Sequence, residues 1–146
     1  MINTPNIEQA KKLIKSSKEK PIIVKAQNPE FNRKILEYGH FDILLSIETS
    51  EDKPDNVKYL SSGLNNILAK IAAKNNIAIG IDLKEISNLE KEAQASRLAR
   101  IRQNIKLCRK AKAKLKIINY KDKRNLIALL ISLGASTQQA KETIDF

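Results

Sequence analysis

Four short aliphatic runs, each followed by a helical pattern, constrain the fold of this chain more than any other feature. The runs span 22–24, 42–47, 77–83 and 115–119. The run at 42–47 (DILLSI) has no polar alternation, which is typical of a strand buried on both faces of a parallel sheet. Regular alternation of strands and helices favours a parallel sheet with right-handed crossovers.

The segments between these runs carry the apolar spacing of amphipathic helices. We expect helices over 6–17, 28–38, 64–75, 90–113, 122–133 and 137–144. In the longest of them, the apolar residues that share one face are Leu98, Ile101, Ile105 and Cys108. Four strand–helix units make half of an eightfold barrel, so the sequence predicts an α/β fold, an incomplete TIM-like barrel with four parallel strands, in one domain over 1–146. An open doubly wound sheet is the alternative architecture.

The positive charge of the chain is concentrated in one stretch. The chain has 27 Lys and Arg against 16 Asp and Glu, a formal net charge of +11. Residues 91–124 contain thirteen basic residues and two acidic ones, so this stretch alone accounts for the whole net charge. An exposed helix ordinarily mixes both signs to gain ion pairs between successive turns. The scarcity of acids therefore indicates a docking surface for a polyanion, above all nucleic acid, rather than a helix kept basic for solubility.

We expect a basic ridge along the helix at 90–113 and past its end. Arginine suits phosphate because its planar guanidinium can donate two parallel hydrogen bonds. The residues expected to contact nucleic acid are Lys70, Arg97, Arg100, Arg102, Lys106, Arg109, Lys121, Lys123 and Arg124. Cations at a helix C-terminus can simply complement the helix dipole, but that explanation does not extend to Arg97 or Arg124.

Composition narrows the class of protein further. Apolar residues make up 42% of the chain, too much for a disordered basic tail, and aromatic residues make up 4%, too little for a platform that stacks bases. The one cysteine, Cys108, excludes a disulfide within the chain and any site with several thiolates. The sequence contains no signal-peptide pattern or long apolar run, so we expect a soluble, cytoplasmic protein with no membrane partner.

Candidate catalytic residues are few. The single histidine is His40, and the acids near the expected strand ends are Asp42, Glu48, Asp82 and Glu85. A degenerate metal-dependent barrel hydrolase would use Asp42, Asp82 and His40, although Asp82 is more readily explained as a helix N-cap. Gly80 stands alone within a strand, where it indicates close packing rather than a phosphate-binding loop. We therefore expect no catalytic residue, no protein-bound metal and no bound cofactor.

Three motifs occur in an order that is typical of one family. They are residues 63–70 (GLNNILAK) with the strand that follows, residues 97–104 (RLARIRQN), and residues 123–130 (KRNLIALL) with Gly134 and Ala140. The first resembles the signature G-[LI]-[ND]-H-V-L-A-K of archaeal ribonuclease P protein component 3, the relative of the eukaryotic thirty-kilodalton subunit. The second resembles the basic helix of that family and the third its P-R-D-L-I-x-L-x-x-x-x-G tail. The resemblance covers nearly the whole chain.

The resemblance implies a TIM-like barrel related to metal-dependent hydrolases but without their catalysis. It implies an RNA-binding subunit that supports the catalytic RNA of ribonuclease P in the 5′ maturation of precursor tRNA, with Mg²⁺ serving the RNA. The implied partners are the RNase P RNA, precursor tRNA and ribonuclease P protein component 2, with which the family forms a heterotetramer. RNA contact carries over most directly to Lys70, Arg97 and Arg124, which lie in matching motifs.

The sequence departs from the family in three places. The signature His is Asn66, the Pro and Asp of the tail are Lys123 and Asn125, and the loop before the tail is shorter. The first strands of the family barrel have no counterpart, so the strand at 22–24 would be a bare parallel edge. We expect another chain to cover it: a second copy of this chain, a separately encoded N-terminal piece, or the partner subunit.

Two other functions stay open at this point, the degenerate hydrolase and a general DNA- or RNA-binding module outside ribonuclease P. The polar segment at 48–62 is the one long loop, and the sequence does not determine its conformation.

Overall fold

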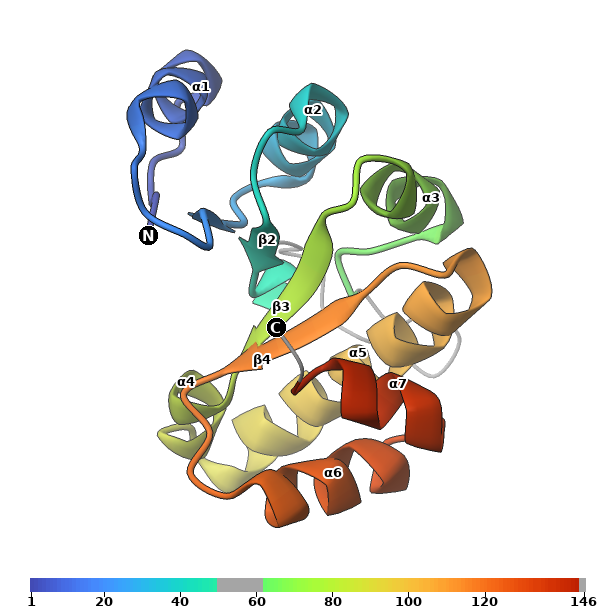
Figure 1. The fold of residues 1–146 in the computed structure, drawn as a ribbon. Coiled ribbons are helices and arrows are strands. Elements are labelled where there is room, and N and C mark those ends of the chain that lie inside the picture. The colour runs from blue at the N-terminus through green and yellow to red at the C-terminus, as the bar shows by residue number, and fades with distance from the viewer. Residues whose placement is uncertain (50–61, 145–146) are drawn as a thin grey trace.

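A four-stranded parallel sheet forms the centre of the fold (Figure 1). The computed structural model describes residues 1–49 and 62–144, so most of the loop expected at 48–62 lies outside the described residues. The strands are β1 (Ile23–Lys25), β2 (Ile43–Leu45), β3 (Ala78–Asp82) and β4 (Leu115–Ile118). The helices are α1 (Ile7–Ser16), α2 (Pro29–Tyr38), the 3-10 helix η1 (Ile47–Thr49), α3 (Asn66–Lys74), α4 (Leu83–Ser87), α5 (Lys91–Ala111), α6 (Lys123–Ser132) and α7 (Thr137–Glu142).

The sheet winds in one direction, as in a TIM-like barrel. Its strand order is β1-β2-β3-β4, so each strand pairs in parallel with the next one in sequence. A doubly wound sheet would instead reverse its strand order at a switch point. Helices α1, α2, α3 and α5 pack against one another in chain order. The α/β fold expected from the sequence, a partial TIM-like barrel with four parallel strands, is confirmed, and the doubly wound alternative is excluded.

One face of the sheet packs against the helices and forms the main hydrophobic core. The strand register aligns Val24, Leu44, Ile79 and Leu115 across the four strands. Each of these side chains is at most 2% exposed. This aliphatic row explains why short strands suffice here, since every residue of the row contributes a fully buried side chain.

The side of α5 that faces this core is the one that its apolar spacing predicted. Ile101, Ile105 and Cys108 are buried, and Leu98 is partly buried at the edge of the same cluster. Burial raises the pKa of the Cys108 thiol to about 12, so this residue acts as a small core hydrophobe rather than a reactive thiol. Ile131 on α6 is 45% exposed.

Side-chain caps set the helix starts. Backbone N–H groups of the first turns donate to the side chains of Asn6, Asn28, Asn65, Asp82, Asp122 and Ser136. The N-cap of α3 is Asn65, because the helix begins at Asn66. Ser62, just before it, donates to the Leu64 carbonyl. The short helix α4 was not predicted; Asp82 caps it, as its N-cap interpretation required.

The β1 edge of the sheet is partly covered by the start of the chain. The Ile2 amide donates to the Ile23 carbonyl and the Lys25 amide donates to the Ile2 carbonyl, both at 2.8 Å. These two bonds form a parallel bridge between Ile2 and Val24. The expectation of a bare parallel edge is therefore corrected: at this point the edge is paired within the chain.

Gly80 of β3 lies opposite Leu45 of β2. A Cβ atom at this position would lie 2.5 Å from Ile43 Cγ2 and 3.1 Å from Leu45 Cδ1. Both side chains belong to strand β2 and are at most 1% exposed. The close packing inferred from the sequence is confirmed, because glycine leaves the space that the two β2 side chains fill.

We predict that Gly80→Ala lowers the free energy of unfolding by about 1–3 kcal/mol, since overpacking a tight core forces side chains off their rotamers. Urea unfolding followed by circular dichroism measures the change. In an Ile43→Ala background, which removes the nearest clashing methyl group, the penalty of the second substitution should shrink. Additive effects of the two substitutions would show that the predicted clash is not the cause.

Candidate nucleic-acid interface

Arg97 lies at the carboxyl ends of the strands, in a cluster of charged side chains. Helix α5 follows β3 and α4, so its first turns lie near these strand ends. The Arg97 Nε donates to Glu48 Oε1 at 3.1 Å, and its Nη2 donates to Glu85 Oε1 at 2.9 Å. Lys25 completes the cluster, with its Nζ 3.3 Å from Glu85 Oε2. Two carboxylates from different elements thus hold one guanidinium.

The two carboxylates of this cluster differ in burial and therefore in pKa. The Glu48 side chain is 1% exposed, and burial raises its pKa above the ordinary value, with the charge of Arg97 opposing that shift. Partial burial acts to raise the pKa of Glu85 as well. The hydrogen bond and charge of Arg97, together with Lys25, outweigh that effect, so the pKa of Glu85 is lowered. The ionised state of the buried Glu48 thus depends on Arg97.

The predicted RNA contact of Arg97 stays a prediction, and these internal contacts do not favour it. Its side chain is 9% exposed, and its guanidinium is hydrogen-bonded to two carboxylates. The guanidinium is therefore poorly placed to bind a phosphate. Its role is to fasten α5 to the strand ends. Arg100, one turn further along, is half-buried and donates to the Glu48 carbonyl at 3.1 Å, so it too contacts η1.

A groove between α5 and the end of α6 brings together three of the predicted residues. Arg102, Lys106 and Arg109 are exposed and recur at the spacing of one helix face. Together with Ala99, Gln103, Leu133 and Gly134, they line a hollow of about 400 Å³, which we call the α5/α6 groove. No lining residue is acidic. The groove is therefore a cationic trough with an apolar component.

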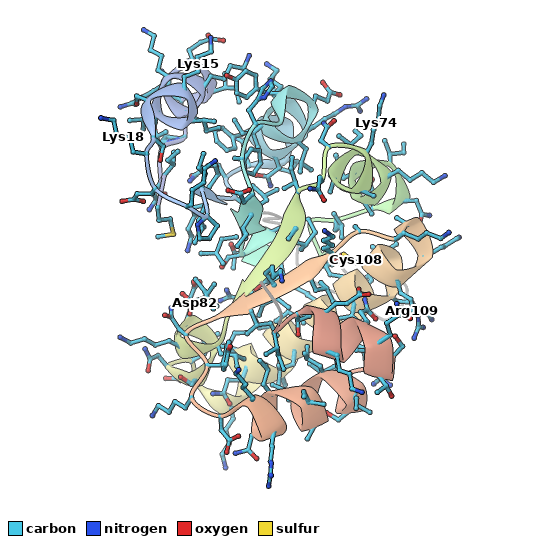
Figure 2. All side chains as sticks on the ribbon, viewed as in Figure 1. Lys15, Lys18, Lys74, Asp82, Cys108 and Arg109 are labelled. Carbon is cyan, nitrogen blue, oxygen red and sulfur yellow. The ribbon has the colours of Figure 1, made fainter. Side chains whose placement is uncertain are left out.

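The cations of the α5/α6 groove are not neutralised by neighbouring acids. Arg109, labelled in Figure 2, donates through Nη1 to the carbonyl of Gly134, two residues beyond the end of α6, at 2.9 Å. Arg102 and Lys106 have no hydrogen bond or ion pair within residues 1–49 and 62–144. Unpaired cations in a concave surface retain their charge for an anionic ligand.

The other predicted contacts lie in separate places. Lys121, Lys123 and Arg124 are exposed together at the start of α6, at the end of that helix opposite to the groove. Since α6 has 10 residues, about 15 Å separate the two ends. Lys70 is exposed on the neighbouring helix α3. The nine predicted residues thus divide into the groove cluster, the cluster at the start of α6, the single Lys70, and the two arginines held at the strand ends.

Sequence reasoning missed Gln103 in the groove and Glu48 as the partner of Arg97. Gln103 directly follows Arg102 in the sequence, and the structure places it on the wall of the same groove. A neutral polar residue in a basic helix carries no sequence signal of its own. Glu48 comes three residues after the buried strand β2, and an acid at such a position is a signal that could have suggested a buried cation partner.

The residues of the hydrolase alternative do not come together. His40 and Asp42 precede the amino end of β2, whereas Asp82 lies at the carboxyl end of β3. The register pairs Ile43 with Ala78, so about 13 Å of strand lies between the two ends. Asp82 accepts bonds from two backbone amides of α4 and from Asn119 Nδ2. Within the described residues, no group of three or more His, Cys, Asp or Glu side chains is placed to hold a metal ion.

The fold and the groove define an α/β protein with a partial TIM-like barrel and a cationic groove on its helices. No helix of the described segments is long and apolar enough to cross a membrane. No family model matches the chain.

Comparison with known proteins identifies what the chain resembles. It is 36% identical over 89 residues to ribonuclease P protein component 3 of Methanosarcina mazei. That match covers 61% of this chain and 34% of the relative, so the chain spans about a third of the relative's length. The resemblance inferred from the three sequence motifs is confirmed.

A solved structure shares the fold. A chain in a cryo-EM structure of archaeal ribonuclease P with mature tRNA superimposes with a TM-score of 0.78 at 24% identity. The match covers 99% of this chain and 62% of that chain. At this level of identity the likeness establishes the fold, in agreement with the partial barrel described above.

We predict that Arg97→Met destabilises the protein by about 3–5 kcal/mol at neutral pH, because it leaves the buried Glu48 carboxylate without its cation. The pKa of Glu48 then rises further, so the loss is full above that pKa and shrinks as the pH falls through it towards the ordinary value of 4.5. Urea unfolding as a function of pH measures both effects. The double variant Arg97→Met, Glu48→Met should regain stability at neutral pH. A penalty that is independent of pH and unrelieved in the double variant would contradict this assignment.

Proposed function

We propose that this chain is a non-catalytic, RNA-binding protein subunit of ribonuclease P that supports the catalytic RNA in the 5′ maturation of precursor tRNA. The observation that carries the proposal is the α5/α6 groove, with three exposed cations and no acid, on a chain similar to ribonuclease P protein component 3. RNA backbones are bound by clustered Lys and Arg that release condensed counterions. The same groove would be of little use to an enzyme that acts on neutral substrates.

The proposed partners follow from the same similarity. They are the RNase P RNA, precursor tRNA and ribonuclease P protein component 2, with Mg²⁺ bound by the RNA rather than by this chain. The proposed RNA-contacting residues are Lys70, Arg100, Arg102, Lys106, Arg109, Lys121, Lys123 and Arg124. A second copy of this chain or a separate N-terminal piece would lie at the β1 edge, beyond the bridge that Ile2 makes.

A general nucleic-acid-binding module is the second candidate function. The net charge of +11 alone would support it equally well. The similarity to a ribonuclease P component favours the first proposal. The two differ in whether the protein changes the activity of the cognate RNA.

Reconstitution tests the proposal directly. We predict that the full chain, together with protein component 2, lowers the Mg²⁺ concentration at which the cognate RNase P RNA cleaves precursor tRNA. Cleavage of labelled precursor tRNA across a Mg²⁺ titration measures the effect, with the RNA alone and with component 2 alone as controls. Tight RNA binding without any change in the Mg²⁺ requirement would favour the general binding module.

The groove cations should set the salt dependence of RNA binding. Replacing Arg102 and Lys106 by Gln removes up to two phosphate contacts, so the slope of log K against log salt should become shallower by roughly 1 to 2 units. Fluorescence anisotropy at several salt concentrations measures the slope. The matched control is Lys15→Gln, Lys18→Gln, which removes two exposed charges near α1, far from Arg109 in Figure 2. Equal slopes for the two double variants would reject the groove as the site of contact.

A further inference from the structure

Gln103 is a polar residue of the α5/α6 groove whose side chain is unsatisfied. Its Oε1 is shielded from water and accepts no hydrogen bond within the described parts of the chain. Gln103 lines the groove together with Arg102, Lys106 and Leu133. A shielded amide oxygen without a donor costs free energy, so a ligand that supplies a donor gains from binding there.

The chemistry of the amide differs from that of the cations around it. Phosphate oxygens accept hydrogen bonds from Arg and Lys but have no hydrogen to donate to an amide oxygen. A ribose 2′-hydroxyl can donate, and it is the group that distinguishes RNA from DNA. The last side-chain torsion of Gln has a broad energy profile, so rotation about it can present the oxygen to a ligand in the groove. The groove therefore offers cations for phosphate and an acceptor for ribose.

The shape of the groove favours one strand over a duplex. A hollow of about 400 Å³ is small, so it suits a single sugar–phosphate backbone rather than a double helix. The groove residues include no aromatic ring on which a base could stack. The bases would therefore point away from the protein, and binding would not depend on their identity.

We propose that the α5/α6 groove binds one ribose–phosphate strand, with Arg102, Lys106 and Arg109 on the phosphates and Gln103 accepting a hydrogen bond from a 2′-hydroxyl. The proposal rests on the proposed RNA-binding function and deepens it, because it assigns the discrimination between RNA and DNA to one residue. Gln103 is thus a specificity-determining residue, whereas the three cations bind either backbone.

The test compares short single strands of one pyrimidine sequence made with ribose, deoxyribose or 2′-O-methyl ribose, bound by the full chain in fluorescence anisotropy. The 2′-O-methyl strand retains an acceptor oxygen but has lost the donor. We expect the ribose strand to bind on the order of three- to tenfold more tightly than either analogue. In Gln103→Met, which retains side-chain volume without polar atoms, the affinity for ribose should fall to the level of the analogues while affinity for the analogues stays the same.

Two further variants distinguish a failure of the Gln103 assignment from a failure of the proposed RNA-binding function. Arg102→Gln with Lys106→Gln should weaken binding of all three strands alike, and Gln9→Met, at an exposed glutamine of α1, should change none. Equal affinities for the three strands in the unmodified chain, or a ribose preference that persists in Gln103→Met, would overturn the assignment of Gln103 while RNA binding itself stands. Failure of the unmodified chain to bind any strand would instead overturn the proposed function.

Discussion

The buried ion pair between Arg97 and its two carboxylates is the interaction on which the functional surface depends. Helix α5 has 21 residues and packs through a narrow buried stripe. Arg97 fastens its first turns to Glu48 and Glu85, and Ile101 and Ile105 anchor the turns that follow. Since each residue turns the helix by about 100°, fixing this side determines which residues face the solvent. The ion pairs of the buried Arg97 thus help to fix the direction in which Arg102, Lys106 and Arg109 project.

The surroundings of α5 preserve the charge that this arrangement exposes. Residues 125–140, which supply most of α6 and α7, include no charged residue in a chain that is 29% charged. Leu133 and Gly134, which directly follow α6, form the other wall of the groove, and the Gly134 carbonyl accepts a hydrogen bond from Arg109. An acidic wall would have neutralised the groove, and a basic wall would have added repulsion between the two helices. A neutral wall allows close packing without either effect.

Much of the fold could be predicted from the sequence, because periodicity reports which side of an element is buried. The parallel strands, the long helix and its buried stripe all follow from the spacing of aliphatic residues such as Ile101 and Ile105. Periodicity does not report what lies opposite a given side chain. Arg97 pairs with Glu48, which is 49 residues away in sequence, and only the assembled fold brings the two together.

The same limit explains why the groove could be predicted only in part. Charge identified Arg102, Lys106 and Arg109, because a cluster of like charges stands out in the sequence. It did not separate them from Arg97, since all four carry the same charge and only burial distinguishes them. Gln103 carries no charge and fits no motif. Its place in the groove wall and its unsatisfied oxygen can be seen only in the folded chain.

In TIM-like barrels the carboxyl ends of the strands are where catalytic side chains ordinarily gather. Here the acidic side chains near those ends are already engaged within the chain. The Arg97 guanidinium lies between Glu48 and Glu85, where a bound cation would otherwise be attracted, and Asp82 is occupied in capping α4. The groups that could have served chemistry at the strand ends instead stabilise the attachment of α5. The exposed cations Arg102, Lys106 and Arg109 lie instead on helix α5, outside this cluster of paired charges.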